Sequence, residues 1–412
     1  MTPHCQLCHA PLTQSFIDLG TMPLANSYLS ESDLARPEPR YPLHARVCGT
    51  CFLVQVDRVV PPDHIFSDYA YFSSYSSSWV EHARRYADMA IRRFGLGRDS
   101  KVLEVASNDG YLLQHFVKAG VPVLGIEPAA NVAAVAEERG VPSRVAFFGK
   151  ALGEALGREG HAADLIVANN VMAHVPDLDD FIAGFAAALK PDGVMTAEFP
   201  HFLNLMREVQ FDTIYHEHFS YLSLLPVERA LGQHGLRLFD VEKLSTHGGS
   251  LRIYACRTES RHREQPGLAA IRADEAAAGL GMVATYRDFQ GKVESIRDGF
   301  RRFLASAGRG GASIVAYGAA AKGNTFLNYC GVGVADIAYV VDRSPHKQGR
   351  FLPGSHIPIH APERIAETRP GYVLILPWNL RQEIARDLAF IGAWGGQCVI
   401  AVPRVDIFAP GG

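Results

Sequence analysis

The chain has 412 residues, of which 48% are hydrophobic and 20% are charged, and its formal net charge is −3 at pH 7. At about 100 to 200 residues per domain, this length indicates about two to four domains. The hydrophobic content excludes wholesale disorder and collagen-like or coiled-coil repeats, and the balanced charge provides no broad basic surface for nucleic acid or acidic lipid. We therefore expect a globular protein that binds neither nucleic acid nor membranes.

The N-terminus and the apolar runs bear on the location of the protein. No apolar run approaches the roughly 18 residues that could span a bilayer, and the first residues lack the charged and then apolar layout of a signal peptide. We expect a cytoplasmic protein in a reducing environment, and we expect it to be a monomer.

Four of the seven cysteines form two Cys-x-x-Cys pairs within the first 51 residues. In a reducing compartment, two such pairs supply four thiolates to one tetrahedral centre, which is typical of structural zinc. The segment between the pairs is rich in proline, which favours an inserted loop over a helix. A redox dithiol or incidental thiols are the alternatives. We expect a zinc-binding domain over residues 1–75, with four ligands to a structural Zn²⁺: Cys5, Cys8, Cys48 and Cys51.

Beyond residue 75, short apolar runs alternate with helical, alanine-rich stretches. Repeated strand and helix units imply a parallel sheet with right-handed crossovers. Two further β-like runs, joined by Thr246-His247-Gly248-Gly249, predict a terminal antiparallel hairpin. We expect a Rossmann-like α/β domain over residues 76–260, with strands at 102–106, 123–127, 165–168, 194–197, 237–244 and 250–255.

The last third of the chain repeats this layout. Residues 266–308 have apolar positions at helical spacing, and a strand at 314–318, a loop, a helix and a strand at 337–341 follow. Residues 261–412 therefore predict a helical connector and a second Rossmann-like α/β domain. The repeated layout is compatible with an ancestral duplication, or with the general similarity of doubly wound folds.

The segment Glu104-Val105-Ala106-Ser107-Asn108-Asp109-Gly110 follows the first strand of the central domain, where open parallel sheets bind nucleotides. It lacks the G-x-G-x-x-G spacing that lets the backbone approach a pyrophosphate. Acids that end the first two strands suit a ligand with a cationic amino-acid end and a ribose, as in S-adenosylmethionine. A helix N-cap role is the alternative for Asn108 or Asp109. The expected cofactor contacts are Glu104, Ala106, Ser107, Asn108, Asp109, Gly110, Glu127 and Asn169.

Residues 211–221 contain two histidines, two acids and two tyrosines. His216 and His218 lack the i, i+4 spacing of a helical zinc pair, which disfavours a metal site here. At this point the chain resembles the S-adenosylmethionine-dependent C-methyltransferases of nucleotide-linked deoxysugars, the sugar C-3' methyltransferases. The resemblance covers essentially the whole chain and rests on the paired cysteines, Ser107-Asn108-Asp109-Gly110, Tyr215-His216-Glu217-His218 and Ala321-Lys322-Gly323.

This resemblance implies a class I methyltransferase fold for the central domain and methyl transfer to C3 of a nucleotide-linked 4-keto-6-deoxy sugar. It implies that Tyr215, Glu217 and His218 supply the reacting centre, and that Asn170 and His174 lie near the sugar. His218 would remove the C3 proton, since its usual pKa of about 6.5 lies close to ambient pH, and Glu217 would orient it or tune its pKa. Asn170, His174 and Tyr215 are candidates to stabilise the enolate. A cofactor or packing role is the alternative for His174.

The nucleotide has two candidate contact regions. Tyr71, Ser74 and Tyr75 could stack on a base or reach a phosphate, or could form a linker that packs over the cleft, and Lys322 could neutralise a pyrophosphate. We expect thymidine diphosphate rather than guanosine diphosphate.

Other functions remain open at this stage. They are O- or N-methyl transfer to a nucleotide sugar, a nicotinamide-dependent oxidoreductase, and a non-catalytic module that binds zinc and a nucleotide sugar. The missing glycine fingerprint disfavours the oxidoreductase.

Overall fold

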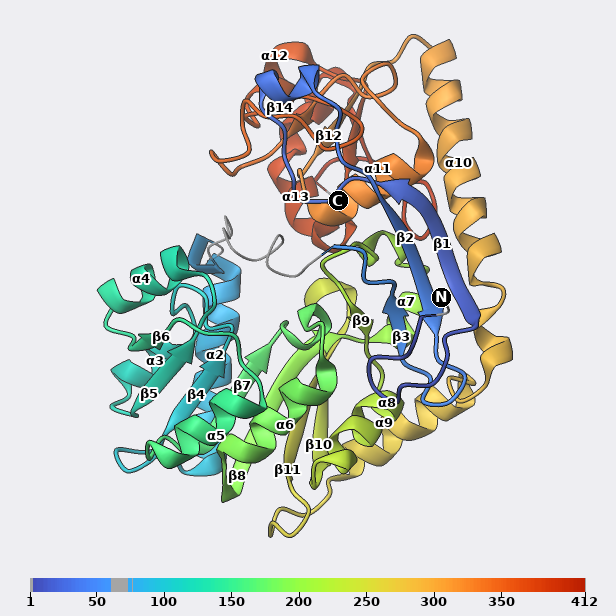
Figure 1. Cartoon of the computed structure of the whole chain (residues 1–412). Coiled ribbons are helices and arrows are strands. Elements are labelled where there is room, and N and C mark those ends of the chain that lie inside the picture. The colour runs from blue at the N-terminus through green and yellow to red at the C-terminus, as the bar shows by residue number, and fades with distance from the viewer. Residues whose placement is uncertain (1–2, 61–72, 76, 412) are drawn as a thin grey trace.

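The computed structural model describes residues 3–60, 73–75 and 77–411. Tyr71, one of the expected nucleotide contacts, lies outside the described residues. The chain forms a four-stranded, a seven-stranded and a six-stranded sheet, in that order along the sequence (Figure 1). This arrangement confirms the expected α/β fold with an N-terminal domain, a central Rossmann-like sheet and a C-terminal α/β domain.

The central sheet has the strand order β10-β11-β8-β7-β4-β5-β6. Strands β4 to β8 are parallel, whereas β11 runs antiparallel to both β8 and β10. The predicted terminal hairpin is therefore confirmed. The strands are β4 (Val102–Val105), β5 (Val123–Ile126), β6 (Ser143–Arg144), β7 (Ala163–Asn169), β8 (Leu189–Pro200), β10 (Leu236–Leu244) and β11 (Ser250–Arg257).

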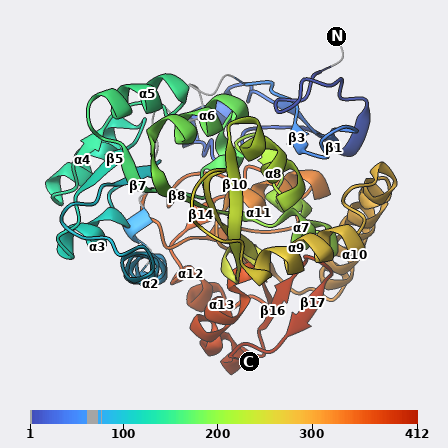
Figure 2. The same ribbon diagram turned by 90° about the horizontal axis from the view of Figure 1, so that it is seen from below.

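Helices cover both faces of this sheet (Figure 2). Alternate side chains of a strand point to opposite faces, so Leu103 of β4 shares one core with α5 and α6, whereas Val102 shares another with α2 and α3. The helices are α2 (Ser77–Phe94), α3 (Leu113–Lys118), α4 (Ala130–Glu138), α5 (Lys150–Arg158), α6 (Leu178–Ala188), α7 (Phe202–Arg207), α8 (Leu224–Gln233) and α9 (Pro266–Ala277).

The N-terminal sheet is antiparallel and has the order β1-β2-β3-β9. The prediction of a loop between the cysteine pairs is wrong, because that segment forms two long strands. In the second of them, buried residues such as Leu43, Ala45 and Val47 alternate with more exposed ones. The strands are β1 (Gln14–Met22), β2 (Tyr41–Val47), β3 (Val54–Val56) and β9 (Ser220–Tyr221), the last coming from the central part of the chain.

The N-terminal sheet shares its hydrophobic core with the rest of the molecule. Phe16 of β1 stacks on Phe289 at 4.4 Å between ring centroids and lies edge-on to Phe202 of α7. The long helix α10 (Phe289–Arg309) extends beside β1 up to the C-terminal domain (Figure 1). The small core expected for an isolated zinc domain is thus supplemented by residues of the two other domains.

The C-terminal sheet has the strand order β14-β13-β12-β15-β16-β17, with only β17 antiparallel. This is the order of a doubly wound sheet, as expected. Its elements are β12 (Ile314–Tyr317), α11 (Ala321–Cys330), β13 (Val340–Val341), β14 (Ile359–His360), α12 (Arg364–Thr368), β15 (Tyr372–Ile375), α13 (Arg381–Asp387), β16 (Gln397–Ile400) and β17 (Asp406–Phe408).

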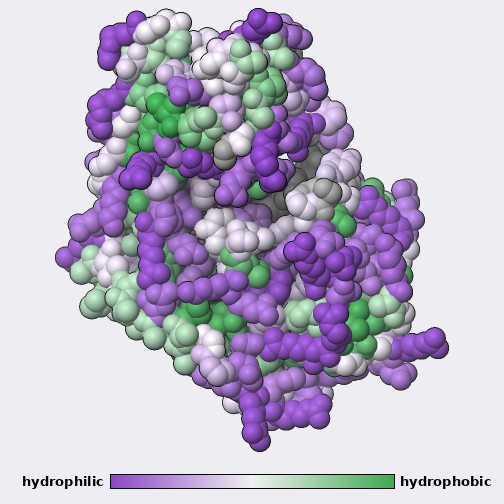
Figure 3. Space-filling model, turned by 180° about the vertical axis from the view of Figure 1, so that it is seen from behind, coloured by the Kyte–Doolittle hydropathy of each residue, from purple (hydrophilic) through white to green (hydrophobic). Residues whose placement is uncertain are grey.

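The surface seen from behind is largely hydrophilic, with apolar side chains in scattered groups (Figure 3). Among the helices of the described residues, none is both long and apolar enough to span a membrane.

The contact between α5 and α6 generates a stability prediction. A Cβ atom on Gly153 would lie 2.4 Å from the carbonyl oxygen of Gly184, whereas one on Gly157 would lie 3.5 Å from that of Ala187. Gly153→Ala should therefore lower the free energy of unfolding by about 1–3 kcal/mol, despite the higher helix propensity of alanine. Gly157→Ala, the matched control, should be neutral or stabilising. Urea denaturation measures both, and equal effects would contradict the prediction.

Candidate active site and zinc centre

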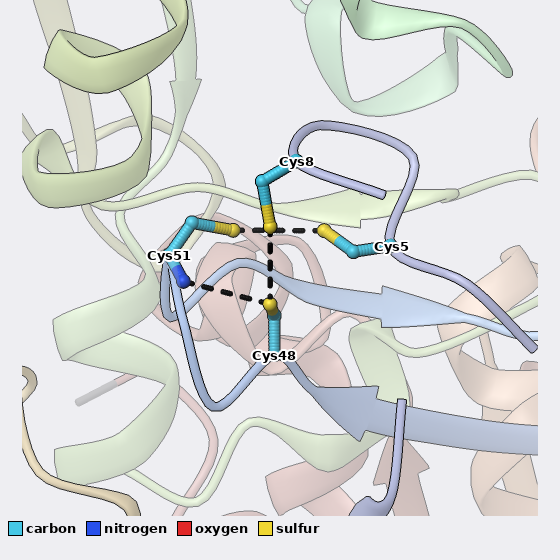
Figure 4. Close-up of side chains that lie close together, drawn as sticks. All are labelled: Cys5, Cys8, Cys48 and Cys51. Atoms are coloured by element: carbon cyan, nitrogen blue, oxygen red, sulfur yellow. Dashed lines mark hydrogen bonds between the residues drawn. The ribbon is translucent and has the colours of Figure 1, made fainter. Parts of the chain in front are cut away.

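The four N-terminal cysteines converge on one point (Figure 4). Their sulfur atoms all lie within 4.8 Å of one another, with 3.5 Å between Sγ of Cys5 and Cys51 and the same between Cys8 and Cys48. Four thiolates at the usual Zn–S length of about 2.3 Å are about 3.8 Å apart in a tetrahedron, so the cluster fits zinc. With four protein ligands the ion has no open position, and the site is structural.

The expected cofactor loop joins β4 to α3 and contains three residues with positive φ. Ala106, Asn108 and Gly110 have φ values of 56°, 50° and 75°. These are left-handed conformations that glycine adopts readily and that strain other residues. Ala106 and Asn108 therefore take the backbone conformation of glycine without being glycine. A Cβ atom on Gly110 would lie 2.9 Å from Cγ2 of Val141, so this position has no room for a side chain.

Acidic side chains converge beneath this loop. Glu127 accepts hydrogen bonds from the backbone N–H groups of Asn108 (3.0 Å) and Ala129 (2.9 Å). Oε2 of the buried Glu104 has no hydrogen-bond partner among the described residues. Burial, followed by the charges of Glu127 and Asp109, raises the pKa of Glu104 well above its usual range. An unsatisfied buried acid among other acids fits a cationic ligand, such as the amino group of S-adenosylmethionine.

Two of the expected cofactor contacts, Asn108 and Asp109, fix the conformation of the loop through hydrogen bonds to other segments. The carboxylate of Asp109 accepts from Arg139 (2.8 Å) and from the hydroxyl of Ser74, and Asn108 Oδ1 accepts from the backbone N–H of Ser73 (2.8 Å). The structure thus places the hydroxyl of Ser74 on the carboxylate of Asp109. Tyr75 is exposed and stacks on His346 of the C-terminal domain.

A cavity of about 1100 Å³ extends from the cofactor loop to the C-terminal domain. This volume exceeds that of most single-ligand pockets, so it can hold two substrates side by side. The expected residues that line it are Ala106, Asn108, Glu127, Asn169, Asn170, His174 and Lys322.

Asn170 follows β7 on the wall of this cavity and has two marks of a functional residue. Its φ is 54°, and its side-chain Nδ2 is buried with no partner among the described residues. Strained backbone and an unsatisfied buried donor are costly, and they persist where a ligand uses them.

His218 lies behind this wall in one defined tautomer. Its Nδ1 is 2.9 Å from the carbonyl oxygen of Thr213, which can only accept, so Nδ1 carries the proton. Its Nε2 therefore carries the lone pair and accepts from the hydroxyl of Tyr215 at 2.7 Å. The ring of His174 is 4.6 Å from that of His218, and its Nδ1 donates to the backbone carbonyl of Glu217 (3.0 Å).

Burial disfavours the protonated, charged form of both imidazoles. It lowers the pKa of His174 to about 4 and that of His218 well below its usual range. His218 therefore differs from the expectation that it titrates near ambient pH, although it is neutral and holds a lone pair at neutral pH.

The carboxylate of Glu217 does not orient His218, in contrast to the expectation; the carbonyl of Thr213 does. Both carboxylate oxygens of Glu217 instead accept from Nδ2 of Asn26, at 2.8 and 2.9 Å. Burial raises the pKa of Glu217 to about 7, and the hydrogen bond from Asn26 opposes the rise.

Lys322 of α11 reaches the cavity from the C-terminal domain. Its ammonium group lies 4.5 Å from the centre of the Trp378 ring and contacts Asn379. Burial lowers the pKa of Lys322, and the charge of Asp212 opposes this. Trp378 also donates its indole N–H to Asp212 (2.7 Å), which links the C-terminal domain to the segment 211–221.

Several cavity residues were not found from the sequence. Trp79 of α2 stacks on His82 at 4.9 Å, and His82 contacts the buried Glu198 at 2.9 Å. His247, at the tip of the β10–β11 hairpin, has φ of 54° and a pKa that burial lowers to about 4. A histidine before two turn glycines was a usable signal, whereas nothing local distinguishes Trp79 or His82.

The parallel sheet, its glycine-like loop and its acidic cofactor pocket define a class I methyltransferase that depends on S-adenosylmethionine. Three family models match successive parts of the chain: "Putative zinc binding domain" (residues 5–66), "Methyltransferase domain" (79–241) and "C-methyltransferase C-terminal domain" (245–403). The "C-methyltransferase NovU" of Streptomyces niveus is 36% identical over 405 residues, which are 98% of this chain and 96% of that protein. The chain therefore belongs to the C-methyltransferase family.

Other proteins match only part of the chain. A "Ubiquinone biosynthesis O-methyltransferase" of Bartonella bacilliformis is 32% identical over 96 residues, or 23% of this chain and 39% of that protein. The magnesium protoporphyrin IX methyltransferase of Synechocystis, solved with S-adenosylmethionine, matches 49% of this chain and 99% of that one, with 13% identity and a TM-score of 0.35.

The zinc centre generates a prediction of metal content. Cys48→Ser should reduce zinc from one equivalent per chain to a small fraction and lower the thermal midpoint by roughly 5 °C or more, because metal binding stabilises the folded domain. Cys398→Ser, at a buried cysteine of β16, is the control and should keep its zinc. Elemental analysis and calorimetry measure both, and full zinc content in Cys48→Ser would refute the assignment.

Glu127 generates a prediction of cofactor affinity. Glu127→Gln removes a charge and turns an amide N–H₂ toward a backbone donor, so the Kd for S-adenosylmethionine should rise about 10- to 100-fold. Glu137→Gln, at an exposed site on α4, should leave the Kd within twofold. Isothermal titration calorimetry measures both, and an unchanged Kd in Glu127→Gln would contradict the prediction.

Proposed function

We propose that this C-methyltransferase transfers a methyl group to C3 of a 4-keto-6-deoxy sugar that is carried by a nucleoside diphosphate, thymidine diphosphate in preference to guanosine diphosphate. S-adenosylmethionine, when bound, supplies a methyl group on a positively charged sulfur. The similarity to a C-methyltransferase over nearly the whole chain and the large two-ligand cavity support this proposal.

The observation that carries the proposal is the tautomer of His218. Carbon is not nucleophilic until a neighbouring ketone acidifies its C–H bond and a base removes the proton. Nε2 of His218 holds a lone pair for this purpose, next to the cavity wall and within reach of Tyr215. Methyl transfer to oxygen or nitrogen does not require a base that removes a proton from carbon.

The proton is proposed to reach His218 through Tyr215. As the C3–H bond breaks, the phenol oxygen of Tyr215 takes that proton and its own proton moves to Nε2 of His218. The electron pair of the C–H bond moves toward the C4 oxygen and gives an enolate. His218 is thus the general base, and the imidazolium that forms keeps its Nδ1–H bond to Thr213.

Asn170 is the proposed donor to the enolate oxygen. Its Nδ2 is a buried donor on the cavity wall with no partner among the described residues, and a donor in this role contributes about 3 kcal/mol to transition-state stabilisation. His174 is not a donor in this arrangement, because its proton is on Nδ1 and engaged with Glu217. At the other end of the cavity, Lys322 is the proposed contact for the pyrophosphate.

A deuterium-exchange assay tests the base. In D₂O, with S-adenosylhomocysteine in place of the methyl donor, the wild type should exchange the C3 hydrogen of the keto-sugar nucleotide without methylating it. His218→Ala should slow both this exchange and methyl transfer with the true donor by about 100-fold or more. Mass spectrometry and NMR measure the exchange and locate the methyl group.

His216→Gln is the matched control, because His216 lies in the same segment but points to the carbonyl of Pro42. It should exchange at nearly the wild-type rate. Normal exchange in His218→Ala would disprove the base assignment, and a methyl group found on oxygen or nitrogen would disprove the proposed reaction.

A further inference from the structure

We propose that Asn26, which the N-terminal zinc domain supplies, is a positioning residue of the reaction centre that holds and orients the carboxyl group of Glu217. The inference rests on the proposed function in one respect, namely that His218, the residue that follows Glu217, is the base of the reaction. It gives the zinc domain a direct part in catalysis, in addition to its structural one.

The contact between the two side chains is well defined. Nδ2 of Asn26 lies 2.8 Å from Oε1 and 2.9 Å from Oε2 of Glu217, 191 residues away in the sequence. Because one amide group bridges both oxygens, it determines the rotation of the carboxyl plane. Glu217 is only 7% exposed, and among the described residues no other group donates a hydrogen bond to its carboxylate. Asn26 itself is exposed, whereas the carboxylate that it contacts is buried.

Asn26 lies in residues 24–29, a segment that we call the strap and that follows β1 on the way to β2. Hydrogen bonds to other parts of the chain hold the strap in place. Nδ2 of Asn324 donates to the carbonyl of Ala25, and the hydroxyl of Tyr28 donates to that of Ala319 at 2.6 Å. Backbone hydrogen bonds of 3.0 and 2.9 Å join Leu29 to Phe351. These partners belong to the C-terminal domain, so the strap carries Asn26 to the point where all three domains meet.

Glu217 is coupled to the imidazoles of His174 and His218 through its own backbone. Its carbonyl accepts from Nδ1 of His174, and the next residue in the chain is His218. A rotation of the Glu217 side chain that displaced this peptide would therefore disturb the tautomer of His174 and the position of His218. Asn26 prevents that rotation without contacting either imidazole.

The charges around Glu217 set the direction of the pH effect. Burial raises the pKa of Glu217 to about 7 and the Asn26 bond lowers it, so loss of Asn26 should raise it further. Among groups that face it, Tyr28 of the strap has a pKa raised by burial and by the charges of Asp342 and Glu217. Lys347 contacts both Tyr28 and Asp342. The other titratable groups near Glu217 are the imidazoles of His174, His216 and His218. The limb of the pH–activity profile that reports the titration of Glu217 should therefore move to higher pH in the absence of Asn26. This direction is the same whether the protonated or the ionised carboxyl group is the active form.

Asn26→Ala in the full-length zinc-loaded enzyme tests the proposal. We expect kcat to fall about tenfold or more while the Kd for S-adenosylmethionine stays within twofold, and the pH limb to rise by about one to two units. NMR of ¹³C-labelled glutamate carboxyl groups, with the Glu217 signal assigned by its loss in Glu217→Gln, should show the same rise without any substrate. In the Glu217→Ala background, which leaves Asn26 no side-chain acceptor at position 217, Asn26→Ala should have no further effect on kcat.

Glu38→Ala is the matched control, because Glu38 anchors the same β1–β2 connection to the backbone N–H of Gly354 (3.0 Å) and does not contact Glu217. It should leave kcat and the Glu217 titration unchanged. If Asn26→Ala behaves like Glu38→Ala, leaves the Glu217 titration in place, or costs the same factor in the Glu217→Ala background, the proposal is wrong. If the wild type methylates no keto-sugar nucleotide, the proposed function fails instead, and the carboxyl titration still decides the role of Asn26.

Discussion

One hydrogen bond, from Nδ1–H of His218 to the carbonyl of Thr213, determines which ring nitrogen can accept a proton. Its geometry depends on the short turn that contains Thr213, because that turn presents the carbonyl. Phe211, two residues earlier, packs on Phe326 and Tyr329 of α11, and Asp212 accepts from Trp378. The chemistry of the central domain is therefore oriented by packing against the C-terminal domain.

The same segment is held from the other side by the N-terminal domain. Strand β9 pairs with β3, Ser220 contacts Gln6 close to the first zinc ligand, and His216 contacts the carbonyl of Pro42. The apolar residues of this segment, Phe211, Ile214, Phe219 and Tyr221, belong to the core that all three domains share, so its order comes from these neighbours. The conformation of this segment is therefore set by contacts with the two other domains.

The sequence predicted features that depend on local spacing and failed for features that depend on distant contacts. The cysteine pairs, the strands around Glu104 and Glu127 and the terminal hairpin follow from local patterns, and the structure contains them. Asn26 is an ordinary loop residue in the sequence, since its partner is 191 residues away. The lowered pKa of His218 could not be predicted either, because burial causes it and burial is a property of the assembled chain.

The core that joins Phe16, Phe202 and Phe289 limits how the gene can be recombined. Exchanging the amino-terminal third between two related enzymes would put unmatched side chains on both sides of that aromatic cluster, as well as separating a strand from its partner in another part of the sheet. Viable chimeras should therefore inherit residues from several distant regions from the same parent, and breakpoints at apparent domain borders should be among the least productive.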